Sequence, residues 1–212
     1  MMISGTTMVS SVHPVVAPRV TFSTLAKIMG GATPTAQMAM LRSHKYPSDG
    51  PRRGYQNARN QLIEHAISGA PFLPGACLRP YEREAVAAMQ EHRLRLPRNV
   101  TCARASTRSS PWAFRGVDVS VIPDVDISSA LGAGALKGYF AQDALAPDVG
   151  PSMAALVHYY RAHVLGHANV LPRLCLLYEA RTGRLHSAGR RTSLLTKVEV
   201  ACQLIVALWP TL

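Results

Sequence analysis

The spacing of apolar residues changes partway along the chain, and this change constrains the fold more than any other feature. Up to about residue 93, apolar side chains recur every three or four positions, which places them on one face of a helix. Beyond that point β-branched and polar residues alternate, most clearly over residues 117–127, as they do in half-buried strands. A chain with both patterns must pack helices against a sheet. The sequence therefore predicts an α+β (mixed α/β) fold.

Turn-forming residues divide these patterns into elements and segments. The spacing predicts helices over residues 21–29, 33–44, 52–68, 81–93, 148–164 and 193–209. It predicts strands over residues 99–103, 112–115, 117–127, 135–141 and 174–179. We interpret the chain as a flexible arm (1–18), a small helical unit (19–70), a linker (71–80) and an α/β domain (81–212).

The charge of the chain is strongly unbalanced, with 23 Lys and Arg against 12 Asp and Glu and a formal net charge of +11. A positive field of this size attracts polyanions, so we expect nucleic acid, DNA in particular, as a partner. A protein partner or a second copy of the chain stays open. No run approaches the ~20 apolar residues of a membrane span. The four cysteines lie far apart without a Cys-x-x-Cys pair, which favours a reduced, cytoplasmic setting.

Three aspartates and a lysine form the main candidate site. Asp118, Asp124 and Asp126 share one parity along the predicted strand 117–127, opposite to its apolar residues. If the strand stays regular past Pro123, their carboxylates face away from the core. Carboxylate oxygens are the ligands that Mg²⁺ or Mn²⁺ prefers, and Lys137 in the next strand could stabilise charge on a phosphate. These residues predict a metal site, with Asp124 and Lys137 as the catalytic pair.

The Pro123-Asp124 pair and Lys137 resemble the motif of the PD-(D/E)XK restriction-like nuclease superfamily. The resemblance implies a core of a helix, three strands, a helix and a strand, which matches the predicted elements of residues 81–179 in order. It also implies that Asp124 binds the metal together with an acid two residues before the lysine.

That acid position is Ala135 in this chain. Another carboxylate could supply the second ligand, and the candidates are Asp126, Glu179 and Glu84. Alternatively, the site has lost its chemistry. The resemblance therefore leaves two expectations: a DNA-binding or DNA-processing protein with metal-dependent phosphodiester cleavage, or a non-catalytic adaptor of a nucleic-acid assembly.

Residues 21–45 resemble a helix-turn-helix unit in the small residues of the first helix and the glycines at the turn. The resemblance implies that the second helix presents Thr35, Gln37 and Arg42 to a DNA groove. Lys45, Arg52 and Arg53 follow, and their charge suits contacts to the phosphate backbone. The alternative is a pair of core helices.

Arg59 and His65 give a third hypothesis. An Arg and a His on one helix resemble the motif of HEPN ribonucleases. The resemblance implies that Arg59 would stabilise a phosphate while His65 would act in acid-base chemistry on a ribose hydroxyl. A ribonuclease toxin is therefore a further alternative.

Overall fold

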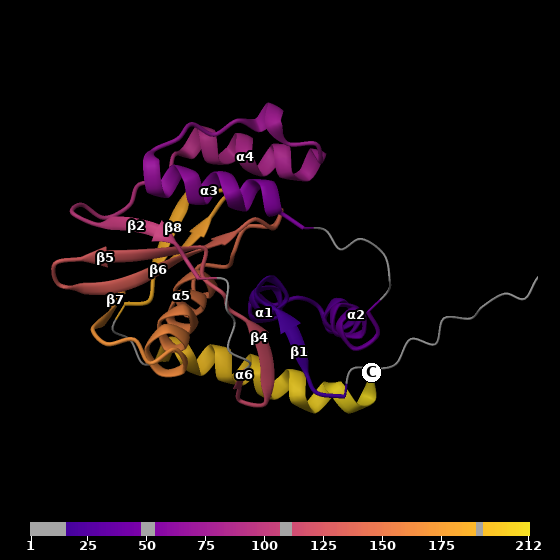
Figure 1. The fold of residues 1–212 in the computed structure, drawn as a ribbon. Coiled ribbons are helices and arrows are strands. Elements are labelled where there is room, and N and C mark those ends of the chain that lie inside the picture. The colour runs from indigo at the N-terminus through magenta and orange to yellow at the C-terminus, as the bar shows by residue number, and fades with distance from the viewer. Residues whose placement is uncertain (1–15, 48–53, 107–111, 190–192) are drawn as a thin grey trace, which may run out of the picture.

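The computed structural model describes residues 16–47, 54–106, 112–189 and 193–212. Among these residues the fold is α+β, as the apolar spacing predicts, with six α-helices and two mixed β-sheets (Figure 1). The helices are α1 (Phe22–Met29), α2 (Pro34–Lys45), α3 (Gln56–Ser68), α4 (Pro80–His92), α5 (Val149–Tyr159) and α6 (Ser193–Leu208). Shorter helical turns are η1 (Pro74–Ala76), η2 (Tyr160–Val164, a π-helical turn) and η3 (Trp209–Thr211).

The larger sheet has five strands in the order β2-β5-β6-β7-β8. Their bounds are β2 (Thr101–Arg104), β5 (Val125–Ser129), β6 (Gly132–Tyr139), β7 (Val170–Glu179) and β8 (Arg184–Ser187). Neighbouring strands run antiparallel except β6 and β7, which are parallel. A parallel pair needs a crossover connection, and α5 provides it.

Both faces of the larger sheet are covered (Figure 1). Helices α3 and α4 pack on one face, where Leu136, Leu176 and Tyr178 are buried. Helices α1, α5 and α6 belong to a second cluster, which includes Ala135 and Leu177 from the opposite face. Alternate residues of β6 and β7 therefore enter different clusters, because successive side chains of a strand point to opposite faces.

The smaller sheet holds β1 (Arg19–Thr21), β4 (Val117–Ser120) and β3 (Ala113–Phe114) in the order β1-β4-β3. Its presence makes the prediction of one strand over residues 117–127 wrong. The segment forms β4 and β5, which lie in different sheets and are separated by residues 121–124. Pro123 lies in this break and has no N–H to donate to a sheet ladder.

Contacts cross the boundary predicted at residues 71–80. Strand β1 pairs in parallel with β4, and α1 contacts both α5 and α6. Helix α3 contacts α4 and β2, while η1 lies within the predicted linker and packs against α4. The 19–70 segment thus contributes to the hydrophobic clusters on both faces of the larger sheet.

By length and composition, the stretch Ser193–Thr211 could cross a membrane, contrary to the expectation from the sequence, and 28% of it is buried. One face of α6 buries Val198, Cys202 and Ile205 in the cluster shared with α1 and α5. The core helix of a folded protein can meet the same length and composition test, so this stretch alone does not indicate a membrane span.

Gly134 marks the closest approach of two strands and gives a test of this sheet. A Cβ at Gly134 would overlap with the carbonyl oxygen of Leu174 in β7. We expect Gly134→Ala to lower the free energy of unfolding by about 1–3 kcal/mol or more, because backbone must move to admit the methyl group. Gly75→Ala is the control, since no atom lies within 4 Å of its added Cβ. Equal midpoints in urea unfolding of the two variants would contradict this packing.

Candidate functional site

Asp124 and Lys137 lie opposite each other at one end of the larger sheet. Val125 pairs with Leu136, and the Asp124 N–H donates to the Leu136 carbonyl over 2.8 Å, so Asp124 comes next to Lys137 in the antiparallel register. The Lys137 ammonium lies 3.2 Å from Asp124 Oδ1. The structure thus brings together the two residues of the predicted catalytic pair.

The Asp124 carboxylate is buried, which corrects the expectation that it faces away from the core. Its residue is only 1% exposed. Two groups besides Lys137 contact it: the Gly138 N–H donates to Oδ2 over 2.7 Å, and Arg59 of α3 forms an ion pair through Nε with Oδ1. One carboxylate therefore compensates two cations, because Arg59 and Lys137 share the same oxygen. We call Asp124, Arg59 and Lys137 the charge cluster.

Burial sets the protonation behaviour of Lys137. Loss of hydration lowers the pKa of its ammonium, and the neighbouring Arg59 lowers it further, while Asp124 acts in the opposite direction. The lysine side chain is 15% exposed and that of Arg59 is 29% exposed, so both cations can still be reached from solvent.

The three aspartates predicted to bind a metal do not converge. Asp118 belongs to the smaller sheet and pairs with Arg19 over 3.3 Å, while Asp126 pairs with Arg161. Each aspartate thus has its own cationic partner. Among the described residues, no group of three or more His, Cys, Asp or Glu could hold a metal ion. The side chains that contact Asp124 are therefore cations, whereas a divalent metal ion needs several oxygen ligands. The surroundings of Asp124 do not fit such an ion.

The position of the missing acid, Ala135, is fully buried opposite Asp126. The other carboxylates proposed as the second metal ligand, Glu179 and Glu84, have partners elsewhere. Glu179 is buried as well; it accepts a hydrogen bond from the Leu145 N–H over 2.8 Å and lies 3.2 Å from His186 Nε2. Glu84 pairs with Arg181 over 3.2 Å. Each of these carboxylates thus serves a contact outside the charge cluster.

A cavity of about 300 Å³ opens beside the charge cluster, and we call it the Arg59–Lys137 pocket. The start of α1, the start of α3, the end of β4 and the end of β6 surround it. It is lined by Thr21, Phe22, Ser23, Gly54, Tyr55, Gln56, Arg59, Ser120, Lys137, Gly138 and Phe140. No described lining residue is acidic, so the two cations face a pocket of hydroxyl, amide and aromatic groups.

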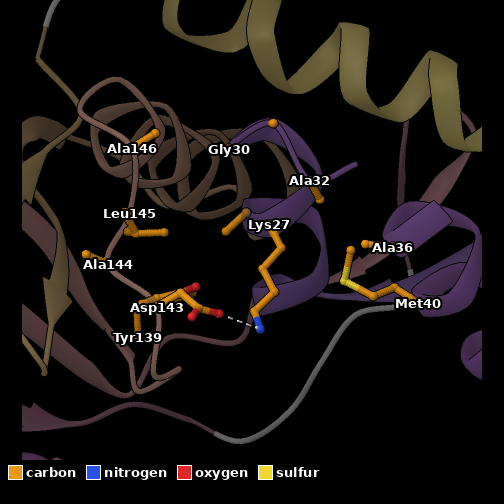
Figure 2. A pocket seen from close by; sticks show the side chains of 12 residues that line it. Lys27, Gly30, Ala32, Ala36, Met40, Tyr139, Asp143, Ala144, Leu145 and Ala146 are labelled. Atoms are coloured by element: carbon orange, nitrogen blue, oxygen red, sulfur yellow. Dashed lines mark ion pairs between the residues drawn. The ribbon is translucent and has the colours of Figure 1, made fainter. Parts of the chain in front are cut away.

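A second cavity, of about 500 Å³, lies between α1, α2 and the loop that follows β6. Small residues such as Gly30, Ala32 and Ala36 line it, and Met40 and Leu145 add apolar surface (Figure 2). Lys27 reaches across toward Asp143, and their charged atoms are 3.2 Å apart (Figure 2). This cavity is therefore mostly apolar, with its one lysine already paired.

The predicted DNA-reading helix is α2, and its polar residues have different environments. Thr35 and Arg42 are exposed. Gln37 instead donates to the Ala32 carbonyl at the turn over 2.9 Å, and Lys45 donates to the Trp209 carbonyl over 2.7 Å. Two residues of the predicted set thus support the fold. Arg52 and Arg53 lie outside the described residues.

Arg59 and His65 serve separate purposes on α3. His65 bonds through Nδ1 to the Ala70 carbonyl over 2.7 Å, and its ring stacks on Phe72 at 4.3 Å. Arg59 pairs with Asp124. The two residues predicted as a ribonuclease pair are thus engaged at different places within one chain.

Three arginines outside the predicted sites follow α4. Arg93, Arg95 and Arg98 are exposed, and none of them forms an ion pair with a described residue. Arg98 also lines a cavity of about 500 Å³ together with Arg173. The signal was present in the sequence as Arg at positions 93, 95 and 98, a short basic run before β2.

Comparison with known proteins adds no relative: no family model, no curated protein and no solved structure matches the chain.

The charge cluster predicts unequal costs for two aspartates. We expect Asp124→Asn to lower the free energy of unfolding by about 3–5 kcal/mol, because it leaves two partly buried cations without their carboxylate. Asp118→Asn should cost less than about 0.5 kcal/mol, since that side chain is 42% exposed and its partner Arg19 is 70% exposed. Chemical denaturation measures both. Similar small losses for the two variants would show that the cluster does not stabilise the fold.

Proposed function

We propose that this protein binds nucleic acid, DNA in particular, as a non-catalytic adaptor with a restriction-nuclease-like core. The main support is that Arg59 and Lys137 both form ion pairs with Oδ1 of the buried Asp124. A carboxylate neutralised by two side chains has little affinity left for a divalent cation, whereas the excess positive charge favours an anion.

The order of the elements supports the likeness to the PD-(D/E)XK core. A helix (α4), three antiparallel strands (β2, β5, β6), a helix (α5) and a strand parallel to the third (β7) follow one another, with β3 and β4 inserted between β2 and β5. The contact of 3.2 Å between Asp124 and Lys137, before β5 and in β6, also supports the likeness. The likeness therefore concerns the scaffold, while the acid at position 135 is missing.

Four exposed arginines that form no ion pair within the described part of the chain support nucleic acid as the partner. Arg93, Arg95 and Arg98 lie exposed in one connection, and Arg42 is exposed on α2. Exposed arginines without carboxylate partners suit phosphate contacts, because the guanidinium group offers a planar set of donors. Together with the net charge of +11, they favour a polyanionic ligand over a neutral one.

Metal-dependent phosphodiester cleavage is the second candidate. The cross-strand contact of 3.2 Å between Asp124 and Lys137 favours it. It would require Arg59 to release Asp124 and a second carboxylate to approach. Because both changes are needed, we rank cleavage below binding, and an HEPN-like ribonuclease lower still.

Salt dependence tests the proposed function. We expect duplex DNA to bind in fluorescence anisotropy at about 50 mM salt and to lose affinity by about a thousandfold at 200 mM if some six phosphates are contacted. The DNA should stay uncut with Mg²⁺ or Mn²⁺. Arg42→Ala should weaken binding more than Arg184→Ala, which removes the same charge from the exposed face of β8. Absence of binding at low salt would refute the proposal, and cutting would favour the second candidate.

A further inference from the structure

We propose that the Arg59–Lys137 pocket binds a single phosphate group of a nucleic acid without a metal ion. This inference rests on the proposed function for the source of the phosphate. The pocket is lined by two cations that share one carboxylate oxygen, and we assign its ligand class from them.

The charges of the pocket favour an anion. With Lys137 protonated, two cations against one carboxylate leave an excess of one positive charge where water access is reduced, and such charges interact more strongly than at an open surface. Burial lowers the pKa of Lys137, and a bound anion acts in the opposite direction because it favours the charged form. Only one of the Lys137 ammonium donors contacts Asp124, and Arg59 faces it through Nε, which leaves the terminal guanidinium nitrogens for another acceptor. The pocket thus supplies donors for which the described protein offers no second acceptor.

The start of α1 adds to this field. Phe22 and Ser23, the first residues of the helix, line the pocket. The Thr21 side chain accepts from the Thr24 N–H, so the N–H groups of the first turn that precede Thr24 have no acceptor within the helix. No acidic residue lies in that first turn. The positive end of the helix dipole therefore adds to the two cations.

A contrast with α3 supports the assignment to this pocket. The start of α3 already has a carboxylate, because the Asn57 N–H donates to buried Glu82 over 2.8 Å. The start of α1 has no such carboxylate among the described lining residues. Tyr55 closes one side of the pocket, held by stacking on Phe140 at 5.8 Å. A base can stack on an aromatic ring while its phosphate contacts the two cations. The pocket therefore suits a nucleotide better than a small carboxylic acid, which has no ring to stack.

Two substitutions at the pocket rim test the proposal without touching the charge cluster. Gln56 is exposed at the first position of α3, where Gln56→Glu suits the helix dipole and should not harm the fold. Ser120→Asp, with Ser120→Asn as its neutral control, places a carboxylate at a second exposed lining residue, at the end of β4. Gln203→Glu makes the same charge change on the exposed face of α6, away from the pocket.

The measurement is calorimetric titration of the whole protein with inorganic phosphate in the presence of EDTA. We expect binding by the wild type, by Ser120→Asn and by Gln203→Glu, and an affinity about five- to tenfold lower for Gln56→Glu and Ser120→Asp. Phosphate that binds only when a divalent cation is added, or equally to all variants, would overturn the proposal. So would the absence of phosphate binding in the wild type.

Oligonucleotides then identify the source of the phosphate. Single strands of one sequence, with a 5′-phosphate or a 5′-hydroxyl, are compared in anisotropy. A preference for the 5′-phosphate that Gln56→Glu removes assigns a strand end, and equal binding that Gln56→Glu weakens assigns an internal phosphodiester; both support the pocket. DNA binding that Gln56→Glu and Gln203→Glu change equally would refute the pocket and leave the proposed function standing. Phosphate binding without any DNA binding would refute the proposed function, and with it a nucleic acid as the source of the phosphate, while the pocket would stand as a phosphate site.

Discussion

The buried carboxylate of Asp124 is the interaction on which the arrangement of this protein depends. It receives Lys137 from the neighbouring strand, the Gly138 N–H from the same strand, and Arg59 from α3. Arg59 comes from the first third of the chain and the other two groups from its middle. A buried carboxylate is costly unless its charge is compensated, so it fixes α3 against the end of the sheet.

This cluster also underlies our proposal for the chemistry at the end of the sheet. A divalent metal acts in hydrolysis through open coordination positions, where it polarises a phosphate or activates a water molecule. A guanidinium group offers charge and directed hydrogen bonds but no such positions. With Arg59 on Asp124 and Arg161 on Asp126, the carboxylates of this sheet serve the fold. What remains is positive charge at a pocket, which suits binding to phosphate.

The larger elements could be predicted from the sequence because they depend on local spacing of apolar residues. Helix α6 and strand β7 are examples: α6 carries apolar residues at helical spacing, and β7 ends in a continuous apolar run that is buried on both faces of the sheet. The facing of Asp124 and Lys137 could also be anticipated, because two adjacent strands place such residues side by side. Cys175 and Cys202 are buried as their apolar surroundings predict, and burial raises the pKa of each thiol to about 12.

Other features depend on contacts between distant segments and leave no local signal. The pairing of Arg59 with Asp124 joins residues 65 positions apart, so local spacing could not connect the two. The break at residues 121–124 sends β4 and β5 to different sheets, which separates Asp118 from Asp124. The strands β1 and β8 were not predicted. With three and four residues, they are too short to show a clear alternation of apolar and polar side chains.

Whether Asp124 binds a divalent cation is tested most directly by titrating ¹⁵N-labelled protein with Mn²⁺. The titration is followed through the amide signal of Gly138. That N–H lies 2.7 Å from Asp124 Oδ2, so a Mn²⁺ ion on this carboxylate would broaden its signal strongly. We expect the Gly138 signal to broaden no more than those of residues beside exposed carboxylates such as Asp143. Selective loss of the Gly138 signal at low Mn²⁺ concentration would contradict it and would make Asp124 a metal ligand.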